Sequence, residues 1–144
     1  GEGAEGLPAT AVSLLGEVAV RLDALLTEGR SDAIDLRALP VMTEADLERL
    51  RGYLGTGEVT AQVSALGMTE LVETAFPGVW WATYYGADDD VVAERIEIAR
   101  VPEILAAQDA DIRSAQKDLL NTVPEPEPDA EAGPEGPPIR PSAD

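Results

Sequence analysis

The sequence predicts an α+β fold, with a four-stranded antiparallel meander and one further short strand carrying helices packed on one face. Three observations favour this class. Apolar residues early in the chain recur three or four positions apart, as they do on a helix that faces a core. From residue 59 onward the spacing changes to two, which is typical of half-buried strands. Short turns separate successive strands, and such turns join antiparallel neighbours.

The chain of 144 residues fits one domain between two unpacked ends. We expect a flexible lead-in over residues 1–8, a single domain over 9–120 and a disordered, acidic, proline-rich tail over 121–144. The tail holds seven of the eleven prolines, and its only sizeable apolar side chains are Val123 and Ile139. Two such side chains bury too little surface to offset the entropy lost on ordering the segment.

Two helices are expected before the meander. The first covers residues 10–28, and its apolar face consists of Leu14, Val18, Leu22 and Leu25. Gly29 follows at the position where glycine commonly ends a helix. The second begins after Thr43, whose hydroxyl is placed to accept a hydrogen bond from the amide of Asp46, and it ends at Gly55.

The remaining elements follow from alternation and from turn residues. We expect a short strand at Ala33–Leu36 and the four strands of the meander at Val59–Ala65, Thr69–Phe76, Val79–Tyr85 and Val91–Ala99. The pairs Gly67–Met68 and Pro77–Gly78 are typical of turns between strands. Pro102 suits the first turn of a further helical stretch, which we expect to restart with Asp109 as its N-cap and to end near Leu120.

Two adjacent tryptophans lie in the third strand of the meander. Neighbouring residues on a strand point to opposite faces, so Trp80 and Trp81 are expected on different sides of the sheet. A symmetric pairing across the loop Gly86–Asp90 sets Trp80 opposite Ile96, and opposed residues share a face. We therefore expect Trp80 in the core and Trp81 exposed on the second face, where an aromatic side chain is a typical interface anchor.

The formal net charge of −18 limits the classes of partner. Such a surface repels phosphate backbones, so we expect no nucleic-acid binding. Either the charge serves solubility alone, or it attracts a basic segment of a partner protein. No apolar run approaches the length of a membrane span and no signal-peptide pattern opens the chain, so we expect a cytoplasmic protein without a membrane partner.

The chain contains neither cysteine nor histidine. Their absence excludes Ser–His–Asp and Cys–His nucleophile arrangements, and it removes the usual ligands of zinc, iron–sulfur clusters and haem. We therefore expect no catalytic residue, no cofactor and no metal site.

The acidic residues offer two further candidates. Asp88–Asp90 lacks the alternating acids of a calcium loop and is interpreted as a solvated hairpin tip. Glu94 shares the apolar face of its strand, where burial would raise its pKa unless a partner pairs with it; we favour an edge position in which the carboxylate reaches water.

Several segments, taken in order and at these spacings, resemble a known family. They are Ala33–Pro40 followed by Asp46, Leu54–Val59, Glu73–Thr74 leading into Pro77–Trp81, and Ile96–Ile98 with Val101–Leu105. Together they are similar to the carboxy-terminal region of the hydrogenase expression proteins called HupH or HyaF. The resemblance implies a non-enzymatic maturation factor for uptake nickel–iron hydrogenases that acts on the iron–sulfur small subunit before its export.

The expected site is therefore a surface for a protein partner. The candidate partner-binding residues are Trp81, Thr83, Phe76, Pro77 and Gly78. The resemblance names the partners as the hydrogenase small subunit precursor and other maturation factors. Two alternatives stay open: a permanent small subunit of a hydrogenase complex, and an enzyme that uses carboxylates. Strand order and oligomeric state are not predicted.

Overall fold

The computed structural model describes residues 6–39, 42–64 and 67–128. Their elements are α1 (Ala9–Glu28), β1 (Asp32–Asp35), η2 (Leu36–Ala38), α2 (Glu44–Leu54), β2 (Thr60–Ser64), β3 (Met68–Glu73), β4 (Val79–Tyr85), β5 (Val91–Ile98), η3 (Glu103–Leu105) and α3 (Asp109–Thr122). The chain divides into two compact units, Gly1–Ala106 and Ala107–Asp144. No helix among the described residues is both long and apolar enough to span a bilayer.

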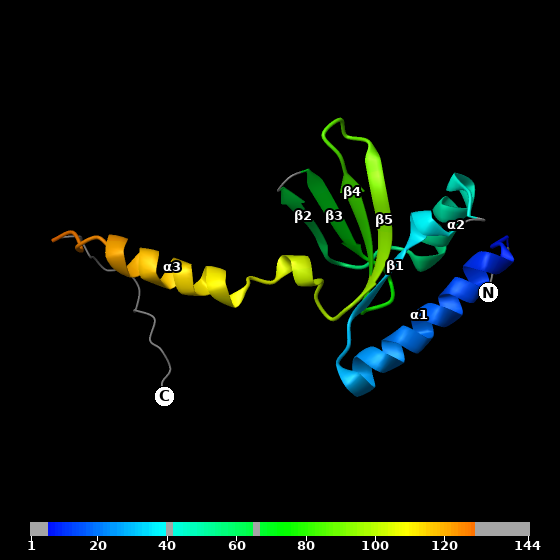
Figure 1. The fold of residues 1–144 in the computed structure, drawn as a ribbon, viewed down its shortest axis with the longest axis horizontal. Coiled ribbons are helices and arrows are strands. Elements are labelled where there is room, and N and C mark those ends of the chain that lie inside the picture. Colours follow the sequence, from blue (N-terminus) through cyan, green and yellow to red (C-terminus); the bar gives the residue numbers. More distant parts are fainter. Residues whose placement is uncertain (1–5, 40–41, 65–66, 129–144) are drawn as a thin grey trace. The chain divides into compact units, whose positions relative to one another are not determined.

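The first unit is built on one antiparallel sheet, seen in Figure 1. Its strand order is β1-β5-β4-β3-β2. The meander runs from β2 to β5, and β1 is the edge strand beside β5. The α+β class predicted from the sequence is therefore confirmed. The strand Ala33–Leu36 was placed one residue late, because Leu36 turns into η2 where the Asp35 carboxylate accepts the Arg37 amide.

The two helices before the meander begin and end as their terminal residues predict. In α2, the Thr43 hydroxyl accepts the Asp46 amide at 3.1 Å, and the Asp46 carboxylate accepts the Thr43 amide at 3.1 Å. These reciprocal bonds satisfy amides at the helix start that lack partners within the helix. Gly29 ends α1 in the left-handed region with φ of 69°, and its amide donates to Leu25.

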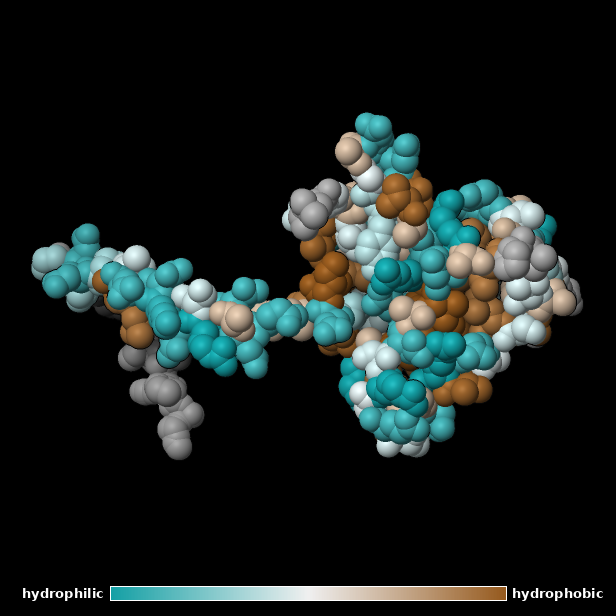
Figure 2. Space-filling view, viewed as in Figure 1, coloured by the Kyte–Doolittle hydropathy of each residue, from teal (hydrophilic) through white to brown (hydrophobic). Residues whose placement is uncertain are grey.

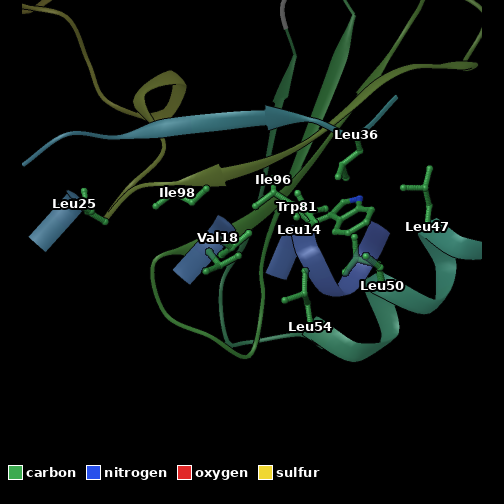
Figure 3. Packing of buried hydrophobic residues seen from close by; sticks show 12 residues of the cluster. Leu14, Val18, Leu25, Leu36, Leu47, Leu50, Leu54, Trp81, Ile96 and Ile98 are labelled. Atoms are coloured by element: carbon green, nitrogen blue, oxygen red, sulfur yellow. The ribbon is translucent and has the colours of Figure 1, made fainter. Parts of the chain in front are cut away.

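Both helices bury their apolar faces against the same side of the sheet. The cluster there contains Ala11, Leu14, Val18 and Leu25 of α1, Leu47, Leu50 and Leu54 of α2, and Leu36, Val79, Trp81, Ile96 and Ile98. Figure 3 shows the Trp81 indole among Leu14, Leu36 and Leu50. This helix-covered face holds the main core, as the fold class requires.

The opposite face holds a smaller second cluster. Leu71, Trp80 and Ala82 are buried there, and Leu105 of η3 packs against them. The Trp80 indole N–H donates to the carbonyl oxygen of Ala99 at 3.1 Å, which satisfies its one polar group inside the cluster. Both tryptophans are therefore buried, on different sides of the sheet.

The predicted faces of the two tryptophans are reversed in the structure. Trp81, not Trp80, lies opposite Ile96 and faces the helices, while Trp80 pairs with Glu97. The cause is an irregularity between Tyr84 and Tyr85 that shifts the register of the hairpin by one residue. Because side chains alternate with a period of two, a shift of one residue exchanges the faces.

The helical stretch expected from Pro102 is divided into η3 and α3. Pro102 is buried before η3, and Asp109 is the first residue of α3 rather than its N-cap, which is Gln108. The second unit is described by α3, which has no buried residue: Ile112, Leu119 and Leu120 are all exposed. The expected disordered tail lies partly outside the described residues, which end at residue 128.

Candidate partner-binding surface

The five predicted partner-binding residues lie in two separate environments. Phe76, Pro77 and Gly78 occupy the turn between β3 and β4, where Phe76 is 44% exposed. Trp81 and Thr83 are each 2% exposed and face the helices. The prediction of an exposed Trp81 is therefore wrong, because the register shift moves its ring into the core. Only the three turn residues lie at the surface or close to it.

Thr74 organises this turn through its buried hydroxyl. The hydroxyl donates to the carbonyl oxygen of Val79 at 2.9 Å and accepts from the Phe76 amide at 3.1 Å. The Ala75 amide donates to the carbonyl oxygen of Leu54, which fixes the turn against the end of α2. These bonds hold the Phe76 side chain at a defined place between the sheet and the helices.

Gly78 allows the turn to lie close to α1. Its φ is +94°, a conformation that residues with a Cβ rarely adopt. A Cβ at this position would lie 3.0 Å from the Leu22 side chain. The Gly78 carbonyl also accepts from the Ala99 amide at 3.0 Å, so the turn is tied to the chain after β5.

An apolar pocket separates this turn from α1. Its volume is about 210 Å³, and it is lined by Leu15, Val18, Ala19, Leu22, Tyr53, Leu54, Phe76 and Val79. Tyr53 and Phe76 stack with ring centroids 6.3 Å apart and planes inclined by 21°. The stacked rings form one wall of the pocket, opposite α1.

A second pocket continues the first along α1. It has a volume of about 400 Å³ and is lined by Leu22, Leu25, Leu26, Glu73, Pro77, Gly78 and Arg100. Leu22 lines both pockets, so we treat them together as the α1 groove. Figure 2 shows hydrophobic atoms reaching the surface between α1 and α2. Leu26 is 71% exposed and lies in this groove beside Leu22 and Leu25.

Beside Trp81 on the helix-covered face, Glu94 is buried, and its carboxylate has two polar partners. It accepts the Trp81 indole N–H at 3.3 Å and pairs with the Arg37 guanidinium at 3.4 Å. The favoured expectation of a carboxylate that reaches water is therefore wrong, since Glu94 is only 9% exposed. The Arg51 guanidinium lies over the Trp81 ring, 5.3 Å from the ring centre. This network stabilises the junction of α2, η2 and the sheet.

Thr83, directly opposite Glu94, carries the one buried side-chain polar atom of the described chain that has no hydrogen-bond partner. Its hydroxyl lies under the helices and does not reach the surface, since the residue is 2% exposed. Thr83 therefore contributes to the interior of the fold and does not form part of the groove.

The opposite face carries its own polar cluster around Tyr84. The Tyr84 hydroxyl donates to the Glu97 carboxylate at 3.0 Å, and the Arg95 guanidinium lies 5.0 Å from the centre of the ring. Burial, followed by the neighbouring Glu97 charge, raises the pKa of the Tyr84 hydroxyl above its ordinary value.

The acidic loop between β4 and β5 is a solvated hairpin tip. Asp88, Asp89 and Asp90 are all exposed, and the turn closes through the Gly86 amide and the Asp90 carbonyl oxygen at 2.9 Å. Among the described residues no three acidic side chains are grouped so that they could hold a metal ion.

The groove includes residues that the sequence did not single out as a site. Leu22 was assigned to the core of α1, and Tyr53 and Leu26 received no role. Their exposure depends on where the β3–β4 turn meets α1, which is a contact between distant segments. The one local signal was Leu26, an apolar residue lying just outside the regular stripe of its helix.

Comparisons with known proteins agree on one family. Residues 9–124 match the family described as HupH hydrogenase expression protein, C-terminal conserved region. The chain is 32% identical over 116 residues to the hydrogenase expression/formation protein HupH of Rhodobacter capsulatus, covering 74% of this chain and 42% of that protein. It is 30% identical over 87 residues to HoxQ of Azotobacter vinelandii, covering 60% of this chain and 30% of that protein. It thus spans less than half the length of these curated relatives.

A solved structure extends this agreement to three dimensions. The hydrogenase expression protein HupH from Thiobacillus denitrificans ATCC 25259 superimposes with a TM-score of 0.75 at 43% identity. The match covers 81% of this chain and 96% of that one. The sequence match over residues 9–124 and the shared fold show that the chain belongs to the HupH hydrogenase expression protein family.

Proposed function

We propose that this chain is a non-catalytic accessory factor for the assembly of a nickel–iron uptake hydrogenase. In this proposal it acts in the cytoplasm and binds the precursor of the iron–sulfur small subunit in the α1 groove. The names of the relatives, hydrogenase expression/formation proteins, support the accessory role.

The α1 groove is the observation that carries the binding role. Leu26 and Phe76 expose 71% and 44% of their surface beside the partly buried Leu22 and Tyr53. An apolar segment of a partner that covers this surface gains about 25 cal/mol for each Å² removed from water. A groove with an aromatic wall and polar residues at its border has the composition of an interface centre.

The charge of the chain supports a basic partner segment. A net charge of −18 raises the rate of encounter with a positively charged protein and disfavours association with acidic ones. Glu73 lies at the border of the groove, whereas Arg100 beside it limits the negative potential there. Apolar contacts therefore provide the affinity in this proposal, and charge provides the orientation and rate.

Co-purification of the small subunit precursor with variants of this chain tests the proposal. Leu26→Ser removes an exposed apolar side chain from the groove. Val20→Ser is the matched control, because Val20 lies on the same helix, is 65% exposed and does not line the groove. We expect Leu26→Ser to weaken binding about tenfold, the effect of losing roughly 1.4 kcal/mol of apolar contact. Val20→Ser should bind like the wild type.

Two results would contradict the proposal. Equal capture of the precursor by Leu26→Ser, Val20→Ser and wild-type protein would show that the groove is not the contact. Absence of capture by the wild-type protein, with the precursor folded and in excess, would show that the small subunit precursor is not the partner. Melting temperatures of both variants should stay near the wild-type value, because neither side chain belongs to the buried core.

A further inference from the structure

The edge strand β2 presents an open row of backbone groups. β2 is the last strand of the sheet and pairs with β3 alone among the described strands, as Figure 1 shows. Unpaired edge groups are a template for a further strand, so proteins usually protect them with charges, prolines or bulges. The five residues of β2, Thr60–Ser64, include no charged residue and no proline, and their register with β3 is regular.

The pairing with β3 determines which groups of β2 point outward. The Glu73 amide donates to the carbonyl oxygen of Val59 at 2.9 Å, just outside the first pair of the ladder, so Thr60 and Val72 form a non-hydrogen-bonded pair. Hydrogen-bonded and non-hydrogen-bonded pairs alternate along an antiparallel ladder. The amides and carbonyls of Thr60, Gln62 and Ser64 therefore point away from β3, toward the open side of the sheet.

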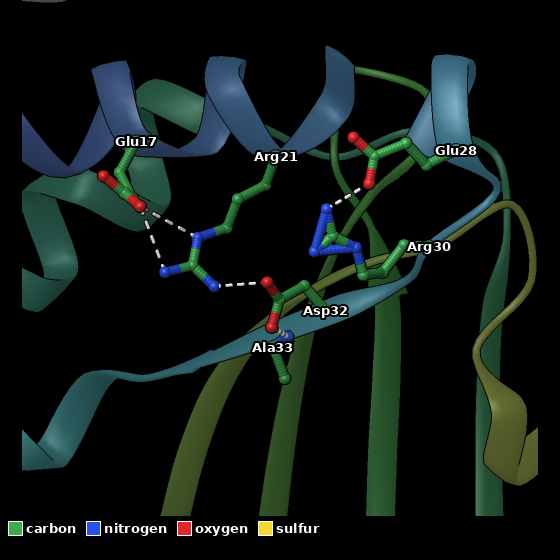
Figure 4. A network of polar contacts seen from close by, with 6 residues as sticks. All are labelled: Glu17, Arg21, Glu28, Arg30, Asp32 and Ala33. Atoms are coloured by element: carbon green, nitrogen blue, oxygen red, sulfur yellow. Dashed lines mark hydrogen bonds and ion pairs between the residues drawn. The ribbon is translucent and has the colours of Figure 1, made fainter. Parts of the chain in front are cut away.

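The other edge of the sheet is protected in a way that β2 is not. β1 begins with Asp32, whose carboxylate pairs with Arg21 of α1 at 2.5 Å and also accepts the Ala33 amide. Figure 4 shows Arg21 reaching from α1 to both Glu17 and Asp32. Asp35 ends the strand, so charged side chains occupy both ends of β1. An incoming strand would displace these groups at β1 but would meet no such obstacle at β2.

The chemistry beside β2 differs between the two faces of the sheet. Ala61 and Val63 pack with the second cluster, so their side of the sheet is apolar beside the edge. Val63 also borders an open pocket of about 430 Å³ with Met68 and Ile104. Gln62 lies on the other side, directly across from Glu70. An added strand would therefore lie beside the apolar Ala61 and Val63 on one face and beside the uncharged Gln62 on the other, where Glu70 is one strand further in.

The charged side chains of β2, β3 and the segment just before β2 are all acidic. Residues 52–73, which include β2 and β3, contain no lysine or arginine, and their acids are Glu58, Glu70 and Glu73. A strand with basic side chains is attracted to this side of the sheet. A second copy of the chain that paired β2 with β2 would bring the acids next to each β2, Glu58 and Glu70, closer to those of the other copy, which costs free energy.

We propose that β2 binds an extended segment of a partner protein by strand addition, with basic and apolar residues alternating along that segment. Backbone hydrogen bonds to Thr60, Gln62 and Ser64 supply the affinity, and the alternation supplies the specificity. Neither the edge nor its charge depends on the α1 groove. The test below contains no hydrogenase subunit, so its failure is distinguishable from failure of the proposed function.

The test uses two eight-residue peptides of alternating composition, one of lysine and valine and one of glutamate and valine. Each is titrated to millimolar concentration into the full chain, and amide hydrogen exchange is followed residue by residue. The lysine peptide should slow exchange at Thr60, Gln62 and Ser64, whereas the glutamate peptide should not.

Gln62→Pro removes one outward amide without removing a bond to β3, and proline is tolerated at such edge positions. It should weaken the lysine peptide about tenfold, whereas Gln62→Thr, which keeps the amide, should not.

A second variant keeps the test decisive if Gln62→Pro fails to fold. Gln62→Lys retains the amide and adds a positive charge across from Glu70, so it should weaken binding of the lysine peptide and strengthen binding of the glutamate peptide. Three results would overturn the proposal. They are no protection at the three amides, equal protection by both peptides, and a wild-type dimer in sedimentation that Gln62→Pro dissociates. The last would identify the occupant as a second copy of the chain.

Discussion

Replacing Trp81 with alanine tests the packing of the helix-covered face most severely. Trp81 is 2% exposed, and a buried aromatic side chain removes roughly 150–250 Å² from water. At about 25 cal/mol per Å², that burial corresponds to roughly 4–6 kcal/mol, close to the 3–5 kcal/mol typical of Trp→Ala substitutions. Glu94 would also lose its indole donor, which adds about 1–3 kcal/mol. Together, the typical Trp→Ala cost and the lost donor give an expected loss of about 4–8 kcal/mol in the free energy of unfolding.

Urea denaturation followed by far-UV circular dichroism measures this loss. Trp81→Phe is the control, because it keeps an aromatic ring and removes the indole N–H; we expect it to lose about 1–3 kcal/mol. Trp80→Ala should also be costly, since Trp80 is 4% exposed and donates to Ala99. A loss below about 1 kcal/mol for Trp81→Ala, with an unchanged denaturant slope, would show that its ring does not lie between the helices and the sheet.

Two further predictions concern the β3–β4 turn and the opposite face. Gly78→Ala should lower the free energy of unfolding by about 1–3 kcal/mol, because Gly78 has a positive φ and a Cβ there would approach Leu22. Gly52→Ala is the comparison: it lies inside α2 with open space around it, so it should raise the free energy of unfolding by about 0.5–1 kcal/mol. Urea denaturation in which both variants changed stability in the same direction would contradict the turn geometry. The raised pKa of Tyr84 means that the folded state keeps a proton which the unfolded state releases, so stability should fall as the pH rises above about 10. Tyr84→Phe should show a smaller decline between pH 9 and 11, and an identical decline in both proteins would argue against the raised pKa that burial and Glu97 give Tyr84.

The elements that local sequence determines were predicted well. The Thr43–Asp46 capping box and Gly29 mark helix ends through groups within a few residues of each other. The meander follows from period-two alternation and from the Pro77–Gly78 turn, which are also local. Its exact pairing does not, because the irregularity between Tyr84 and Tyr85 leaves no pattern in the sequence. One extra residue in the hairpin was enough to exchange the faces of both tryptophans.

The candidate site was predicted only in part, because it joins segments distant in sequence. Phe76, Pro77 and Gly78 were selected as candidates, but their neighbours Leu22 and Tyr53 come from two helices. Burial of Glu94 depends in the same way on distant groups. Its partner Arg37 lies in η2, and α2 covers the space above it. Periodicity identifies which side chains of a strand share a face, but not which of the two faces a helix covers.

Crosslinking from inside the α1 groove tests the central claim most directly. A photoreactive amino acid is placed at position 26, and in a matched protein at position 20, and each protein is irradiated with the hydrogenase small subunit precursor. We predict a covalent product from position 26 and little or none from position 20, because only Leu26 lines the groove. Equal products from both positions, or products from position 20 alone, would contradict the assignment of the groove as the binding surface.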